Sequence, residues 1–213
     1  YNSAFGRDAL GANTTGAYNT AVGKSALSAN TIGSENTGIG QRALEDATGG
    51  FNTAVGSSTL RELTTGTYNT AVGQGAMKYT TTGINNVAIG NDSLRNLSTG
   101  YYNTAVGRSA LLSNSTASYN TGVGYMSLYT NTTGAENTAL GQSSLKMNTT
   151  GARNTAIGGA SQLSVTTGSD NTSVGRDTLY TTTTGASNVA VGSDALKANT
   201  TASHNTGIGY KAG

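Results

Sequence analysis

A 17-residue repeat runs through the whole chain and constrains its fold more than any other feature. The string Asn-Thr-Ala-Val-Gly and its variants occurs 13 times, from Asn2 to Asn205. Its Asn residues are 17 residues apart in eleven of the twelve intervals and 16 apart between Asn36 and Asn52. A disordered chain has no physical reason to keep this register, so we expect an ordered repeat fold.

Each repeat is numbered here from position 1, the Asn, to position 17. The consensus is Asn-Thr-Ala-(Val/Ile)-Gly-x-x-Ala-Leu-x-x-Asn-Thr-Thr-Gly-x-Tyr. The short repeat is expected to lack a residue between Leu44 and Thr48.

The composition excludes several protein classes. Leu, Ile, Val and Phe together make up only 33 of 213 residues, too few for a conventional compact enzyme domain. The chain has no Cys or Pro, which excludes a disulfide scaffold, a thiol redox centre, a Cys-based zinc site and a collagen. Because only 10% of the residues are charged, the composition also differs from that of a typical disordered chain.

Seventeen residues suit one coil of a parallel β-solenoid, with two short strands and two turns. We therefore expect an all-β fold of about thirteen coils, forming a single continuous repeat domain over residues 1–213 within a longer fibre protein. Of the 31 Gly, 13 lie at position 5 and ten at position 15, where the chain is expected to turn or to approach a neighbouring coil closely. Ala117 and Ala202 replace Gly at position 15, so a positive φ is not expected to be required there.

The alternation of side chains along a strand predicts two opposite faces. Position 4 is apolar in all 13 copies, and we expect it to face a core. Position 2, where Thr exchanges with Val87 and Val189, shares that face and is expected to be inward or half-buried. Position 3 is always Ala, Gly or Ser, and we expect it to point outward against a neighbouring chain. This small-residue row comprises Ala4, Ala21, Gly38, Ala54, Ala71, Ala88, Ala105, Gly122, Ala139, Ala156, Ser173, Ala190 and Gly207.

A second strand is expected to carry the Leu of position 9, for example Leu27 and Leu94. In the repeat that follows Asn154 the Leu falls one place later, at Leu163, which predicts a local bulge. The thin core argues for association of several chains.

The repeated motif resembles repeats of phage tail-fibre proteins and, more loosely, the Asn-Ser-Val-Ala-Ile-Gly head repeats of trimeric autotransporter adhesins. The resemblance covers the whole chain, although the period of 17 is longer than in those heads. It implies a left-handed parallel β-roll assembled as a homotrimer. With the small-residue row as the interface, it predicts a homotrimeric fibre.

Charge and hydropathy narrow the choice of partners. The net charge of +2 indicates no basic patch and no nucleic-acid partner. No apolar run is long enough to insert into a membrane as a helix. Absence of Cys fits the extracellular location that a fibre implies, and the first residue is not Met, as in a processed or excised piece.

Few residues could take part in catalysis or in binding. We assign no catalytic residue, no metal-binding residue, no ligand-binding residue and no cofactor. Asp177 and Asp194 occupy the same position of adjacent coils, about 5 Å apart if coils stack at strand spacing. A glycosidase needs paired carboxylates, but these would lie on an open ridge. The only histidine, His204, occupies a variable, solvent-facing position, and the 13 Asn of position 1 are expected to form an internal ladder.

Two surface features remain as weaker candidates for binding. Arg61, Lys78 and Arg95 lie at position 10 of three consecutive coils and could dock an anionic polysaccharide, although a variable solvated ridge is favoured. Tyr119, Tyr125 and Tyr129 could form a sugar-stacking patch. Asn-x-Thr strings such as that at Asn13 match a glycosylation acceptor, but turn composition explains them.

The sequence thus favours a structural component of an extracellular trimeric fibre, either a phage tail fibre or a bacterial surface adhesin, that holds a host-binding or surface-binding site. A cell-surface glycan or receptor is a possible partner. Two alternatives from other classes are a Thr-rich ice-binding solenoid and a solenoid enzyme that degrades polysaccharides. Ice binding needs an outward Thr row, and the enzyme would need a catalytic site that the sequence does not provide.

Overall fold

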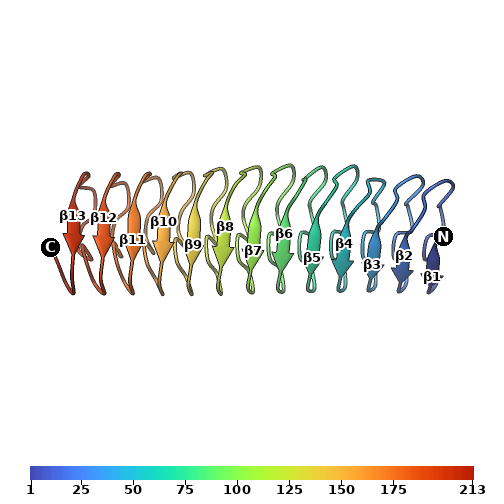
Figure 1. Cartoon of the computed structure of the whole chain (residues 1–213), viewed down its shortest axis with the longest axis horizontal. Coiled ribbons are helices and arrows are strands. Elements are labelled where there is room, and N and C mark those ends of the chain that lie inside the picture. The colour runs from blue at the N-terminus through green and yellow to red at the C-terminus, as the bar shows by residue number, and fades with distance from the viewer. The chain divides into compact units, whose positions relative to one another are not determined.

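The computed structural model describes all residues from 1 to 213, and it contains strands and turns but no helix. The chain divides into two compact units, Tyr1–Asn103 and Thr104–Gly213. Within each unit, successive coils stack so that their strands run parallel in chain order (Figure 1). Each unit is therefore a β-solenoid, which confirms the all-β solenoid predicted from the repeat.

Every strand has three residues and occupies positions 2 to 4 of its coil. The register is direct, so Thr20 pairs with Thr37 and Val22 with Ile39. The first unit holds β1 Ser3–Phe5, β2 Thr20–Val22, β3 Thr37–Ile39, β4 Thr53–Val55, β5 Thr70–Val72 and β6 Val87–Ile89. The second holds β7 Thr104–Val106, β8 Thr121–Val123, β9 Thr138–Leu140, β10 Thr155–Ile157, β11 Thr172–Val174, β12 Val189–Val191 and β13 Thr206–Ile208.

The expected second strand does not form. The Leu of position 9 lies in a run of turns and has a positive φ, 52° at Leu27 and 50° at Leu145. A strand needs an extended backbone, so this side of the coil cannot be one. Hydrogen bonds between coils persist there nevertheless, because Leu27 N–H donates to the carbonyl oxygen of Ala43 at 3.0 Å.

The predicted orientation of the strand faces is wrong. The small-residue row points into the coil, and in the inner coils its members, such as Ala71, Ala105 and Ala156, are fully buried. The apolar row of position 4 points outward instead, and Val174 keeps 37% of its surface exposed. The small-residue row is therefore not available as an interface between chains.

The narrow interior explains why position 3 accepts only small residues. A Cβ placed on Gly38 would lie 3.3 Å from Cγ of Leu27, and one placed on Gly122 would lie 3.2 Å from Cγ of Leu111. The Leu of position 9 thus packs directly against the small row and fills the coil. A larger side chain at position 3 would overpack this interior.

The short coil keeps its interior register and loses its residue at the corner. Ala47 N–H donates to the carbonyl oxygen of Leu44, as Asn30 N–H does to Leu27 in the preceding full-length coil. Thr48 and Gly49 then both donate to the carbonyl oxygen of Thr64. The residue is therefore missing after Thr48, not between Leu44 and Thr48 as predicted.

The expected bulge at Leu163 is also absent. Gln162 takes the interior position 9, fully buried, and its N–H donates to the carbonyl oxygen of Thr178 in the ordinary register. Its side-chain amide donates to the carbonyl oxygen of Thr155 at 2.9 Å and to Oγ of Ser173 at 2.9 Å. Leu163 is displaced to the outer surface because the interior site is already occupied.

Candidate interaction surfaces

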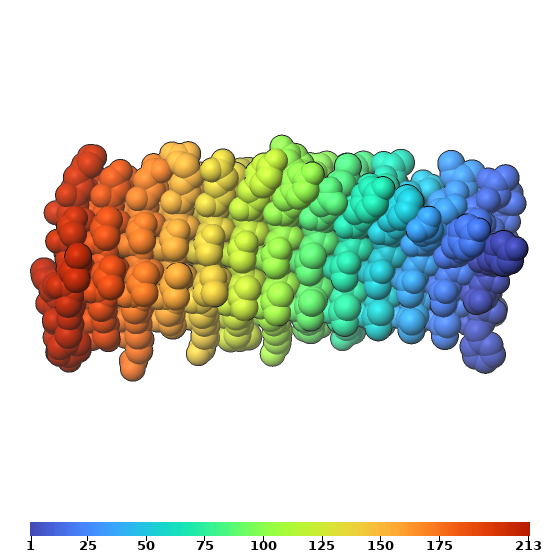
Figure 2. All heavy atoms as spheres, in the orientation of Figure 1, coloured from blue at the N-terminus to red at the C-terminus, as the bar shows by residue number.

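The Thr/Val face consists of the outward side chains at positions 2 and 4 of the strands. Within each unit, side chains at equal positions form rows along the stacked coils (Figure 2). In the inner coils these two rows are half-buried to exposed: Ile157 keeps 39% and Ile89 41% of its surface. No charged residue occurs at either position in any coil. The result is a flat, uncharged face of alternating Thr and Val or Ile rows.

The Asn row of position 1 is structural, as predicted. Asn154 donates from Nδ2 to the carbonyl oxygen of Gly168 at 2.8 Å and accepts the backbone N–H of Asn171 at 3.0 Å. The same pattern repeats from coil to coil and leaves these amides no capacity for a ligand. The Asn of position 12 also points inward, and Asn131 and Asn148 are fully buried, so these Asn-x-Thr strings cannot accept a glycan in the folded chain.

Asp177 and Asp194, the candidate carboxylate pair, share one lysine partner. Nζ of Lys197 lies 2.6 Å from Oδ1 of Asp194 and 3.7 Å from Oδ2 of Asp177, and Nε of Arg176 lies 3.2 Å from Oδ2 of Asp177, so both carboxylates are in ion pairs. The hydrogen bond from Lys197 holds the pKa of Asp194 below its ordinary value. A glycosidase acid needs a raised pKa, so this arrangement opposes that chemistry.

The row of Arg61, Lys78 and Arg95 is partly compensated by acids. Nε of Arg61 lies 3.5 Å from Glu45, and Nη1 of Arg95 lies 3.4 Å from Asp92. The remaining cation, Nζ of Lys78, stands 4.9 Å from the ring centroid of Tyr79. Hydrogen bonds from Lys78 and then Arg95 lower the pKa of Tyr79.

The tyrosines of the predicted patch lie at three different positions of the coil, and His204 shares one of these positions with Tyr119. Tyr125 and Tyr129 lie at positions 6 and 10 of one coil, whereas Tyr119 lies at position 17 of the preceding coil. His204 is exposed at position 17 and has a left-handed backbone with φ of 61°. Other residues at position 17 pair between coils, as in the stacked rings of Phe51 and Tyr68 at 4.8 Å.

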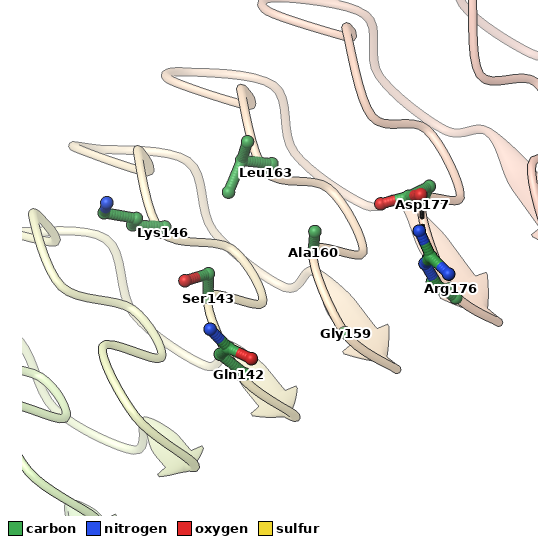
Figure 3. A pocket seen from close by; sticks show the side chains of 8 residues that line it. All are labelled: Gln142, Ser143, Lys146, Gly159, Ala160, Leu163, Arg176 and Asp177. Atoms are coloured by element: carbon green, nitrogen blue, oxygen red, sulfur yellow. Dashed lines mark ion pairs between the residues drawn. The ribbon is translucent and has the colours of Figure 1, made fainter.

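A depression opens in the surface of the second unit where one coil lacks long side chains (Figure 3). Its volume is about 560 Å³. Gly159, Ala160 and Leu163 form its middle, between one coil that carries Lys146 and another that carries Arg176. The full lining is Gln142, Ser143, Lys146, Gly159, Ala160, Leu163, Arg176 and Asp177.

Sequence columns could have revealed this depression. Position 6 carries a side chain in every coil except the one with Gly159, where a Cβ would meet no atom within 4 Å. Ala160 and Leu163, in the same coil, line the depression and carry no long polar side chain that would fill it. The signal was Gly and Ala at the adjacent positions 6 and 7 of one coil, followed by an apolar Leu at position 10.

Two further properties bear on function. No three His, Asp or Glu side chains converge to hold a metal ion, and no helix is present that could cross a membrane. No family model, curated protein or solved structure matches the chain.

Proposed function

We propose that the chain is a structural segment of an extracellular trimeric fibre, from a phage tail or a bacterial surface, that serves as a rigid shaft or head for attachment. The observation that carries this proposal is the Thr/Val face. Soluble monomers rarely leave a large continuous apolar surface uncovered. Here every strand adds one more uncharged pair of outward side chains.

A second copy of the chain is the partner that fits this face best. Along each row, successive Thr or Val side chains are separated by the strand spacing of about 4.8 Å. The same rows on another copy have the same spacing, so every coil can make equivalent contacts. Closed rotational symmetry would let each subunit use one identical face, and the number three rests on the resemblance to trimeric fibres.

Association would also compensate for the thin interior. Each inner coil buries one large side chain at position 9, usually Leu, and only three coils add a second apolar side chain larger than Ala at position 12, namely Leu63, Leu97 and Val165. Covering the outward Val or Ile of each coil would add about 1 kcal/mol per coil, because these side chains are already part-buried. The gain accumulates with the number of coils.

Lysine substitutions on the Thr/Val face test this proposal. The double variant Ile157→Lys/Val174→Lys is expected to convert a trimer into monomers, because it places two charges in an apolar interface. Its coil interiors should stay folded, since both side chains point outward. Light scattering gives the mass, and circular dichroism reports the fold.

The matched control is Thr167→Lys/Thr184→Lys. It adds the same charge to the same two coils at exposed corner positions outside the face. We expect this control to remain trimeric. A native chain that is monomeric, or a control that dissociates as fully as the face variant, contradicts the proposal.

A second candidate is the ice-binding solenoid, which the outward Thr row favours. The exchange of Thr with Val at position 2 predicts an inward row, which argues against ice binding, but the row points outward. Thr155 is half-buried and Thr172 is exposed on the outer face, so a regular Thr row is available to solvent. A monomeric chain with thermal hysteresis, lost on Thr155→Tyr/Thr172→Tyr, would support this candidate. A trimer without hysteresis would support the fibre.

A further inference from the structure

Charges are segregated by position within the coil, although the net charge of the chain is small. In Tyr1–Asn103 all six Lys and Arg lie at positions 6, 7 or 10, together with only three of the six acids. In Thr104–Gly213 five of the six Lys and Arg lie there, with two of the four acids. This surface, the basic edge, therefore carries a formal charge of +3 in each unit. The small net charge of the whole chain conceals this local excess of cations.

Positions 6, 7 and 10 belong to one surface. The depression in the second unit is lined entirely by these positions from three successive coils. A smaller hollow of about 350 Å³ in the first unit is lined by the same positions, including Gln74, Lys78 and Arg95. The basic edge is thus grooved, and the Gly of position 5 separates it from the Thr/Val face.

Two cations of the basic edge flank the depression in the second unit. Lys146 and Arg176 lie two coils apart, which puts them about 10 Å apart along the stack. The coil between Lys146 and Arg176 carries the low surface of Ala160 and Leu163. Lys146 forms no ion pair. Arg176 pairs with Asp177 through Nε, which lies 3.2 Å from Oδ2, so the two terminal nitrogens of Arg176 are free to donate hydrogen bonds.

We propose that the depression around Gly159 binds an extended acidic polysaccharide. Carboxylates of alternate sugars would pair with Lys146 and Arg176, and the sugar between them would lie over Ala160 and Leu163. Gln142, Ser143 and Asp177 would hydrogen-bond sugar hydroxyls. A linear polymer fits because its charges recur along its length, so two of them can reach Lys146 and Arg176 at the same time.

Nucleic acid fits this surface less well. A duplex presents one phosphate charge per about 1.7 Å, and binding requires many cations. The basic edge offers a charge of only +3 in the unit and includes the carboxylates of Asp177 and Asp194. These acids repel any polyanion, but a polymer with more widely spaced charges can place its carboxylates at Lys146 and Arg176 and its hydroxyls at the acids, which a duplex cannot do.

This inference deepens the proposed fibre function by naming the ligand class of an attachment site. The two can fail separately, because the depression lies within one unit and away from the Thr/Val face. Light scattering on each variant below reports assembly, and the binding assay reports the depression.

Binding of a uronic-acid hexasaccharide prepared from alginate tests the proposal by calorimetry on the full chain. Lys146→Gln and Arg176→Gln are each expected to weaken binding about tenfold, the loss of one charge-assisted contact. Gly159→Gln should also weaken it by filling the depression, and its Cβ meets no neighbour within 4 Å. High salt should weaken binding by the native chain.

Arg153→Gln is the matched control, because it removes one positive charge at position 17, where Arg153 pairs with Asp170. Its affinity should stay within about twofold of native. The proposal is overturned if the native chain does not bind the hexasaccharide, if a neutral cello-oligosaccharide of equal length binds as well, or if a DNA duplex binds more tightly. It is also overturned if Arg153→Gln weakens binding as much as Lys146→Gln does.

Discussion

Replacing Gly141 by Ala is expected to destabilise the second unit by about 2–6 kcal/mol, the sum of backbone strain and overpacking. Gly141 has a φ of +132°, a conformation that side chains resist. An added Cβ would also lie 2.6 Å from the carbonyl oxygen of Gly158 in the next coil. Neither coil can move away without breaking the hydrogen bonds that stack them. Urea unfolding at a fixed protein concentration measures the loss.

Gly159→Ala is the control for this substitution. Gly159 has no positive φ, and its added Cβ meets nothing within 4 Å. We expect its unfolding free energy to stay within about 0.5 kcal/mol of native. Equal losses for the two variants would show that close stacking at position 5 does not determine stability.

Replacing Asn154 by Leu is expected to cost about 2–6 kcal/mol. The substitution removes the donor to the carbonyl oxygen of Gly168 and the acceptor for the backbone N–H of Asn171. Both groups lie in fully packed coils, and each buried unsatisfied group costs about 1–3 kcal/mol. The apolar side chain has no compensating space in an interior already filled at position 9. The same urea unfolding assay applies.

Asn205→Leu is the corresponding control in the last coil. Asn205 is only part-buried and accepts no hydrogen bond from a following coil, so water can replace its partners. A loss below about 1 kcal/mol is expected. If Asn154→Leu is no more destabilising than Asn205→Leu, the internal ladder contributes little to the fold.

Strict periodicity made the architecture predictable. The fixed interval of 17 residues required one structural unit per repeat, and the abundance of Gly and Asn excluded helices. The Asn row could be placed correctly because an amide has both a donor and an acceptor, which suits stacking along an axis. Position 5 could be identified as a close approach because only Gly occurs there in 13 copies.

The faces of the strand could not be assigned from the pattern of residue types alone. Positions 3 and 4 both lack charge in every copy, so alternation fixed two faces without saying which one is inside. The interior is narrow, and the Leu of position 9 fills it. Only small residues can then fit opposite, which forces Val and Ile outward. This competition for space depends on the course of the backbone at Leu27 and its equivalents, whose positive φ no sequence rule anticipates.

Two features could have been recognised from the sequence. The interval between Asn154 and Asn171 is 17, so no residue is inserted there and Gln162, not Leu163, had to occupy position 9. The basic edge was also visible, because the cations concentrate in three columns. Net charge concealed it, since the acids of positions 11 and 17 cancel much of the total.

Interchain cross-linking of single-cysteine variants tests most directly whether the Thr/Val face joins copies of the chain. The native chain has no Cys, so each introduced thiol reports one position. Val174→Cys, on the face, is expected to give covalent dimers under mild oxidation, because rotational symmetry brings equivalent rows together. Thr167→Cys, at an exposed corner, should remain uncross-linked at the same concentration. Dimers from Thr167→Cys, with none from Val174→Cys, would contradict association through the Thr/Val face.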